Sequence, residues 1–331
     1  MKQASNLRSK IKFLIYRFFS PRIVDNIRNL LSLRHKFFYR SKDAKNISEF
    51  ISNSKVPINR NLNLLKELHK YFKKINLKEN YKFENLLLSA KNRYNFLEKN
   101  GLNLNGANLA DFGAGHGENL FLCKEYNLSR AVGLDFSDKD FLPHKNDLKN
   151  DVFQFIEFKT LDLVNEDLGI KDFDVITSFS AFEHFHDPKE VLFKCYKSLK
   201  PGGYLYAEFA AFNSPYAIHR KKFSGVPHIQ NIFDEDIAFE FFYDFLKIND
   251  KVNRYTNEPI TNGDPYPEVN RYLIPDYEKI FLDQNLWEVI SYTKIKNYQY
   301  HWFIKLFEDS FKNKDNEYKY VDYLKFLIRK K

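Results

Sequence analysis

The sequence predicts an α/β protein whose central sheet is doubly wound and mostly parallel, with helices on both faces. Three observations lead to this prediction. From residue 108 onward, short apolar runs alternate with helical patterns, which is typical of parallel strands joined by helices. A glycine-rich turn, ADFGAGHG at 110–117, follows the first of these runs. An acidic residue lies near the end of the second run, AVGLDFS at 131–137.

The first part of this region predicts five strands. They are expected in NLADFG (108–113), AVGLDFS (131–137), VFQFIEFKTLDL (152–163), FDVITSFS (173–180) and YLYAEFAAF (204–212). A helix is predicted over 116–126. A second is predicted in DPKEVLFKCYKSLKPGG (187–203), because a proline marks its start and Pro-Gly-Gly its end.

After residue 212 the alternation stops for roughly 60 residues that are rich in Pro, His, Tyr and Phe. It resumes with a helix and a strand in IPDYEKIFLDQNLWEVISYTKI (274–295) and a final strand in YVDYLKFLIRK (320–330). The interruption indicates an insertion at about 212–272. With these two added strands, the predicted fold is a Rossmann-like sheet of seven mostly parallel strands.

The chain before residue 108 carries the net charge and a helical pattern. Residues 1–50 hold 12 Lys and Arg against 3 Asp and Glu, while the rest of the chain holds 40 of each sign. Apolar residues recur at helical spacing near 11–19, 23–31, 60–75 and 83–99. We therefore predict a basic helical N-terminal extension over 1–80 and an α/β domain over 81–331 that contains the insertion.

The composition favours a cytoplasmic protein. No uncharged apolar run is long enough to cross a bilayer, and the apolar stretch IKFLIYRFF at 11–19 is interrupted by Lys12 and Arg17, unlike a signal peptide. Two cysteines, Cys123 and Cys195, suggest no disulfide framework. The abundance of Phe, Tyr, Ile, Asn and Lys is typical of an AT-rich, bacterial genome.

The motifs and their order resemble the class I S-adenosylmethionine (SAM) dependent methyltransferases. DFGAGHG at 111–117 resembles the first motif of that family, D/E-x-G-x-G-x-G, and GLDFS at 133–137 resembles the end of its second strand. LDL at 161–163, the Glu-His pair in FSAFEHF at 179–185 and LKPGG at 199–203 resemble its later motifs. The Glu-His pair is common in the small-molecule, type 11-like branch. The resemblance covers about 85–331.

The resemblance implies a transferase of the EC 2.1.1 class whose cofactor is SAM. The glycine turn would let the methionine end of SAM approach the main chain, and the helix expected after it would direct N–H groups at the carboxylate. The acidic residue of the second strand would accept hydrogen bonds from both ribose hydroxyls. Since a sulfonium activates its methyl group without a metal, no metal site is predicted. The implied cofactor-binding residues are Asp111, Gly113, Ala114, Gly115, Gly117, Asp135, Phe136, Asp162, Leu163 and Ser178.

For the general base, the sequence offers three histidines. His184 follows the fourth strand at the edge where ligands gather, and His219 and His228 lie in the insertion, which is expected to cover the pocket. Each also has a structural interpretation, as a packing or capping residue, so all three remain candidates.

The predicted acceptor is a small molecule or a lipid- or glycan-linked one, and sugar O-methylation in polysaccharide biosynthesis is the leading hypothesis. A neutral α/β domain does not favour nucleic acid as a partner. The basic segment 10–34 either packs as a solvated helical pair or contacts the inner face of the membrane. Two alternatives stay open: a nicotinamide-dependent oxidoreductase, and a catalytically silent methyltransferase fold that acts as an interaction protein.

Overall fold

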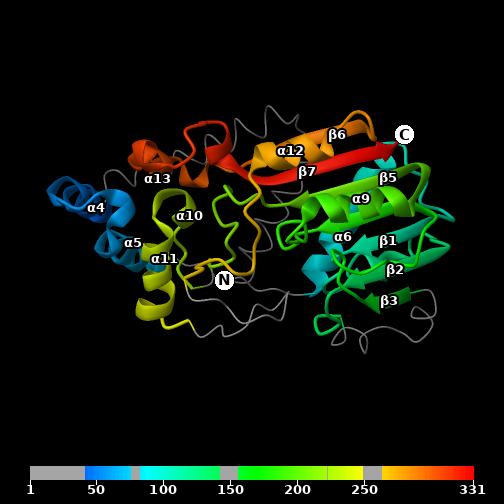
Figure 1. The fold of residues 1–331 in the computed structure, drawn as a ribbon, viewed down its shortest axis with the longest axis horizontal. Helices are drawn as coiled ribbons and strands as arrows, with labels where there is room; N and C mark the ends of the chain where they lie inside the picture. The colour runs from blue at the N-terminus through cyan, green and yellow to red at the C-terminus, as the bar shows by residue number, and fades with distance from the viewer. Residues whose placement is uncertain (1–41, 76–82, 142–155, 222, 249–262) are drawn as a thin grey trace, which may run out of the picture.

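The computed structural model describes residues 42–75, 83–141, 156–221, 223–248 and 263–331. The helices predicted before residue 42 therefore lie outside the described residues. Figure 1 shows a seven-stranded sheet with its flanking helices at one end of the molecule and a group of helices at the other. Within the described ranges, none of the helices has the length and hydropathy that crossing a membrane requires.

The sheet has the strand order β3-β2-β1-β4-β5-β7-β6. The first five strands pair in parallel, and β7 joins antiparallel to both β5 and β6. The predicted Rossmann-like sheet of seven mostly parallel strands is thereby confirmed. The strands are β1 (Asn108–Phe112), β2 (Arg130–Asp135), β3 (Ile156–Thr160), β4 (Phe173–Phe179), β5 (Leu199–Phe209), β6 (Trp287–Lys296) and β7 (Val321–Lys330).

Alternate residues of the strands pack into different clusters on the two faces of the sheet, as the two-residue period of a strand requires. Leu109 of β1 belongs to the cluster that α6 (Phe83–Lys99) covers, whereas Ala110 belongs to the cluster that α9 (Pro188–Ser198) and α12 (Ile274–Phe281) cover. Helix α9 begins as the sequence predicts: Pro188 occupies its first turn, and the Asp187 side chain accepts a hydrogen bond from the backbone N–H of Glu190 at 3.1 Å.

The helices at the other end of the molecule share a separate apolar core. Segments far apart in the sequence meet there, from the part before the sheet, from the segment between β5 and α12, and from the segment between β6 and β7. They are α4 (Lys42–Asn53), α5 (Leu62–Ile75), α10 (Ile229–Ile232), α11 (Glu235–Phe239), α13 (His301–Leu306) and the π-helix η3 (Glu240–Phe245). The short 3₁₀ turns are η1 (Ile58–Arg60), η2 (Leu120–Leu122), η4 (Tyr298–Tyr300), η5 (Glu308–Ser310) and η6 (Tyr318–Tyr320).

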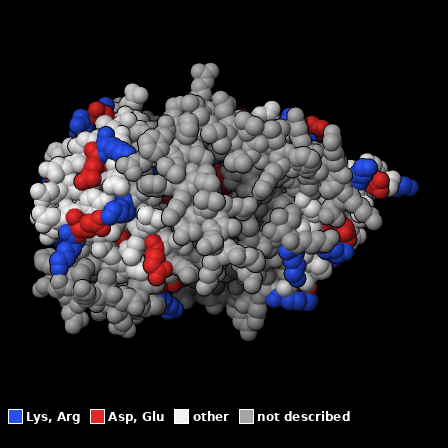
Figure 2. Space-filling model, turned by 180° about the vertical axis from the view of Figure 1, so that it is seen from behind, with Lys and Arg blue, Asp and Glu red and all other residues white. Residues whose placement is uncertain are grey.

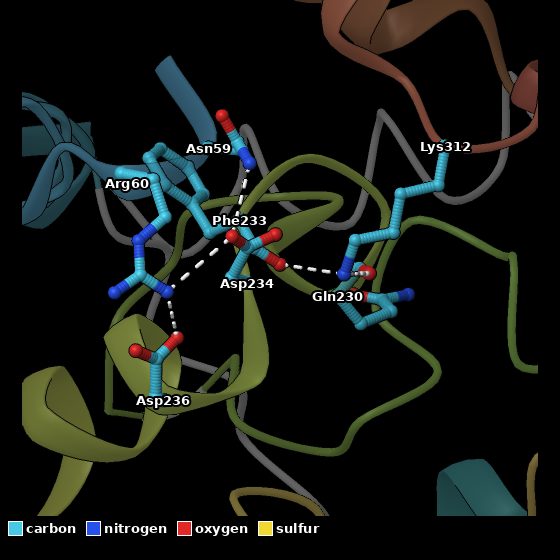
Figure 3. Close-up of polar contacts among 7 residues, drawn as sticks. All are labelled: Asn59, Arg60, Gln230, Phe233, Asp234, Asp236 and Lys312. Atoms are coloured by element: carbon cyan, nitrogen blue, oxygen red, sulfur yellow. Dashed lines mark hydrogen bonds and ion pairs between the residues drawn. The ribbon is translucent and has the colours of Figure 1, made fainter. Parts of the chain in front are cut away.

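Hydrogen bonds and ion pairs connect these three segments (Figure 3). Asn59 and Arg60 of η1 both reach Asp234, with Asn59 Nδ2 donating to its carboxylate at 2.9 Å, and Arg60 also pairs with Asp236 at 2.6 Å. From the segment after α13, Lys312 Nζ donates to the carbonyls of Gln230 at 3.2 Å and Phe233 at 2.7 Å. The linker between α10 and α11 is therefore held from both sides. The predicted division into domains at residue 80 stays a prediction.

Candidate functional site

A cavity of about 810 Å³ lies at the carboxyl edge of the parallel strands, the edge at which this class of sheet binds ligands. Its walls come from the ends of β1, β2 and β4 on one side. On the other side they come from the segment between β5 and α12 and from the region around η4 and β7. Of the site residues predicted from the sequence, the cavity wall includes Asp111, Gly113, Ala114, Gly115, Asp135, Phe136, Asp162, Leu163, His184 and His219.

The glycine turn needs glycine at 113 and 115 for different physical reasons. Both have positive φ, at +74° and +49°, which side chains of L-residues rarely adopt. A Cβ at Gly113 would lie 2.3 Å from Cβ of Ala181, so this glycine allows β1 to approach the loop after β4. A Cβ at Gly115 would meet no heavy atom within 4 Å. The sequence-based idea that both glycines make room for a ligand thus fits the surroundings of Gly115 and not those of Gly113.

The helix predicted over 116–126 is not present. The chain there runs through turns, with η2 as its one regular turn, and the N–H of Gly117 donates to the carbonyl of Ala114 at 2.7 Å. Four consecutive residues of this segment, 120–123, are buried. Gly117, at φ +75°, packs against the ring of Phe141 instead. No regular helix therefore directs its N-terminal N–H groups at the cavity from this segment.

Asp135 ties the end of β2 to the glycine turn. Its Oδ2 accepts a hydrogen bond from the N–H of Gly115 at 2.8 Å, and its Oδ1 accepts one from the N–H of Ser137 at 3.2 Å. Burial raises the pKa of this carboxyl, against hydrogen bonds from the backbone that lower it. Each carboxylate oxygen has a second lone pair, so Asp135 retains acceptor capacity toward the cavity.

Asp111 forms part of a buried polar chain that the sequence did not reveal. Its two oxygens accept hydrogen bonds from Thr177 Oγ1 at 2.7 Å and from Asn119 Nδ2 at 2.9 Å. Arg93 of α6 donates to Asn119 Oδ1 at 3.2 Å and lies over the ring of Phe179. Burial raises the pKa of Asp111 to about 7 although both hydrogen bonds lower it. Arg93 and Asn119 line the cavity, and no local motif marks either, because their partners are remote in sequence.

Asp162 lines the cavity and also stabilises the loop that follows it. Its carboxylate accepts hydrogen bonds from the backbone N–H groups of Val164 and Asn165 and from Asn165 Nδ2. Burial alone would raise the pKa of Asp162, but these hydrogen bonds hold it below its ordinary value. Ser178, by contrast, is buried in the sheet, where its hydroxyl donates to the carbonyl of Phe112 at 2.7 Å.

His184 and His219 meet at the part of the cavity that the segment after β5 contributes. Their ring centroids are 4.6 Å apart in an edge-to-face arrangement. His184 Nδ1 lies 2.6 Å from the carbonyl oxygen of Glu268, to which it donates. Glu183, which is not among the site residues predicted from the sequence, lies next to this pair: His219 Nε2 is 3.8 Å from its Oε1. The Glu-His pair after β4 was the signal that could have pointed to Glu183.

His228 corrects the third histidine prediction. It is fully buried against Phe311 and does not belong to the residues found to line the cavity. Burial lowers the pKa of its imidazole to about 3, and Asn231 Nδ2 donates to its Nδ1 at 2.9 Å. A neutral histidine in the apolar core of the helical group packs that core, which disfavours it as the general base.

Comparison with known proteins agrees with this geometry. Residues 110–205, which run from β1 into β5, match the family model described as a methyltransferase domain. No curated protein matches the chain. For residues 110–205 this bears out the predicted class: this part of the chain matches a methyltransferase domain, and the cofactor of the predicted class is SAM. The predicted small-molecule branch is consistent with the match.

Solved structures with some likeness include a SAM-dependent methyltransferase from Mesorhizobium loti. It is 13% identical, with 72% of this chain and 97% of that chain covered at a TM-score of 0.45. Another is the magnesium protoporphyrin IX methyltransferase of Synechocystis with bound SAH, at 11% identity, 74% and 83% coverage and a TM-score of 0.41. At these scores the likenesses carry no argument about the site.

The cavity suits SAM by its own chemistry. Its volume falls within the range of about 300–1,000 Å³ that small-molecule sites occupy. The open space at Gly115 lets a ligand approach the main chain, and the carboxylate of Asp135 is an acceptor of the kind that a ribose diol requires. Phe136 and Leu163 add apolar wall next to the two acidic positions.

Proposed function

We propose that the protein is an enzyme that transfers a methyl group from SAM to an oxygen of a small-molecule, lipid-linked or glycan-linked acceptor. The observation that carries the proposal is the layout of one cavity. The glycine turn and Asp135 lie in one part of its wall, and the pair His184–His219 lies in another, beside Tyr216. When bound, SAM supplies a methyl group on a positively charged sulfur.

The residues of this chain have three tasks in such a transfer. The turn at Gly115 and the carboxylate of Asp135 hold the cofactor, with Asp111 near its charged end. The aromatic pair Tyr216 and Tyr300, whose ring centroids are 5.3 Å apart, forms a wall against which a sugar face can stack. The pair His184–His219 activates the acceptor, whose oxygen forms a bond to the methyl carbon. The methyl–sulfur bond breaks with its electron pair left on sulfur, and the hydroxyl proton passes to water.

The surface favours a small or glycan-type acceptor over nucleic acid. Figure 2 shows Lys and Arg side chains interspersed with Asp and Glu on the described part of one face, without a broad single-sign patch there. Binding to a nucleic acid backbone needs clustered cations, and the excess of cations in this sequence is confined to residues 1–50. We therefore place sugar O-methylation first, in a cytoplasmic bacterial setting.

Calorimetric titration with SAM and with its demethylated product tests the cofactor site. We expect the unaltered protein to bind both and Asp135→Asn to lose at least about tenfold in affinity, because a carboxylate acceptor is lost (about 1.4 kcal/mol corresponds to tenfold). The matched control is Asp138→Asn, three residues further along the same loop and absent from the residues found in the cavity wall. A labelled-methyl screen of acceptors follows. Transfer to RNA or DNA, with none to glycans or metabolites, would contradict the proposed acceptor class.

A further inference from the structure

A group of three metal-ligating side chains lies at the acceptor part of the cavity. Glu183 and His184 follow β4 directly, and His219 comes from the segment after β5. One donor atom from each lies within 4.8 Å of the other two. We propose that Glu183, His184 and His219 bind one divalent transition-metal cation that holds the oxygen of the acceptor. The role given to the acceptor rests on the proposed function; the metal site itself does not.

The first observation that supports a metal site is the burial of Glu183 without a hydrogen-bond partner in the described part of the chain. Its side chain is buried, and neither carboxylate oxygen has a hydrogen-bond partner among the described residues. Its contact with His219, at 3.8 Å, is too long for a hydrogen bond. A buried carboxylate without such partners costs free energy, and buried charges in folded proteins are paired or coordinate a metal. A cation between Glu183 and the two imidazoles would offset that cost.

The second observation that supports a metal site is the hydrogen bond of His184. A carbonyl oxygen only accepts, so Nδ1 at 2.6 Å from the Glu268 carbonyl carries the proton, and the lone pair of the imidazole is on Nε2. Histidines that ligate a metal commonly donate their other ring N–H to a carbonyl in this way, which fixes both tautomer and ring orientation. His219 sits at a backbone φ of +54°, a conformation that is costly for a residue with a side chain and that concentrates at functional sites.

The donor set selects the kind of cation. Two imidazole nitrogens and one carboxylate favour Zn²⁺ or a neighbouring first-row divalent ion over Mg²⁺ and Ca²⁺, which prefer oxygen ligands. Bonds of about 2.0–2.2 Å in a tetrahedral arrangement separate neighbouring ligand atoms by about 3.3 Å. His219 Nε2 lies 3.8 Å from Glu183 Oε1 and the three donor atoms lie within 4.8 Å of one another, so a bound cation would draw the side chains closer together.

Three protein ligands leave a coordination position for a ligand from the cavity, as in catalytic zinc sites. His184 and His219 both line the cavity that also contains the glycine turn. An acceptor hydroxyl in that position would have its pKa lowered by the cation, so it would lose its proton to water more readily. The metal would thus orient and activate the acceptor, while the methyl group needs no such help.

Metal binding by the full chain tests the site directly. The purified protein is stripped with a chelator and titrated with Zn²⁺ and, separately, with Co²⁺, whose visible absorption reports tetrahedral ligation. We expect one equivalent to bind and to raise the unfolding temperature. Glu183→Gln and His219→Asn should each weaken binding at least about 100-fold; asparagine at 219 tolerates the positive φ. The control His186→Asn replaces an exposed histidine next to the group and should bind as the unaltered chain does.

SAM titration on the same samples separates this proposal from the proposed function. Metal binding that depends on Glu183 and His219 supports the site, whether or not SAM binds. If SAM binds and no cation does, or if the cation binds equally to both variants, the metal site is refuted and the cofactor assignment stands. Because Glu183→Gln alters a buried residue, its unfolding temperature is measured too; the partly exposed His219→Asn decides the outcome if Glu183→Gln does not fold.

Discussion

At the scale of single residues, the two glycines of the turn have different roles: we expect Gly113 to be needed for packing and Gly115 for ligand binding. Gly113→Ala places a Cβ 2.3 Å from Cβ of Ala181 at a positive φ, so we expect a loss of about 3 kcal/mol in the free energy of unfolding. Gly115→Ala has the strain of its φ without a clash and should lose only about 1 kcal/mol, yet it should weaken SAM binding at least tenfold. Urea denaturation and calorimetry measure the two effects. Equal loss of stability in both variants would contradict this distinction.

Asp111 should make stability depend on pH in an unusual direction. Burial raises its pKa to about 7 in the folded protein, whereas in the unfolded chain it lies near 3.8. Between these pH values the folded state keeps a proton that the unfolded state has lost, so the free energy of unfolding falls as pH rises from about 4 to about 7. The whole effect is at most about 4 kcal/mol.

Asp111→Asn removes that titration while keeping the size of the side chain. The difference in unfolding free energy between the unaltered protein and this variant should therefore decrease from pH 4 to 7 and level off above 7, as denaturant unfolding across that range would measure. A difference that stays constant with pH would show that Asp111 titrates at an ordinary value in the folded protein.

At the scale of elements, the sequence predicted strands and long helices well and the segment after the glycine turn badly. Strands β1 to β7 fall within the predicted runs or overlap them, because each has either an apolar stretch, as in β2, or an alternation of apolar and polar residues, as in β6. The helix predicted over 116–126 was wrong because a short apolar run such as 120–123 occurs in buried turns as well as in helices, and composition does not separate the two. Local pattern does not reveal that Asn119 is directed at Asp111.

The candidate site was predictable where a motif is contiguous and unpredictable where it is assembled from distant segments. The glycine turn and Asp135 could be read from short stretches. Choosing between His219 and His228, which both lie in the segment after β5, required the fold, since His219 reaches the cavity and His228 packs in the helical core. Arg93 joins the site from α6 through its contacts with Glu118, Asn119 and Phe179, all of which are remote from it in the sequence.

The linker between α10 and α11 offers a test of how the helical group is held. Lys312 Nζ donates to two backbone carbonyls in a partly buried setting, so Lys312→Met leaves both acceptors without that donor and should cost about 1–3 kcal/mol in the free energy of unfolding. Arg60→Ala, which removes the exposed pairs with Asp234 and Asp236 on the other side of the same linker, is the matched control and should cost less. Chemical denaturation measures both; a larger loss for Arg60→Ala would contradict this view.

At the scale of the whole molecule, three apolar clusters and an uneven charge define the protein. The cavity lies where the sheet and the segments of the helical group meet, so residues of both line it. The net charge of +9 is concentrated in residues 1–50, while the remainder is balanced. Of the two roles predicted for the basic segment 10–34, contact with a membrane would use its positive charge, because an anionic lipid surface attracts basic residues.

This hypothesis predicts a specific effect of charge position. Lys10, Lys12 and Arg17 lie beside an apolar pattern of Ile, Leu and Phe in residues 11–19. Replacing the three with glutamine in the full chain should lower partitioning onto phosphatidylserine-containing vesicles about 100-fold, since each basic residue near the surface contributes about 1 kcal/mol. Co-sedimentation with the vesicles measures it, and added salt should weaken binding by the unaltered chain because salt screens the attraction.

The control variant removes the same number of positive charges from a part of the chain outside residues 1–50. Lys55, Lys171 and Lys189 are exposed and lie in the balanced part of the chain, so their replacement by glutamine removes the same three charges. If binding depends on the N-terminal segment, this second variant keeps most of its affinity for the vesicles. Equal loss in both would mean that net charge alone drives the interaction. No binding by the unaltered chain would leave the basic segment with the other predicted role, packing against the rest of the protein.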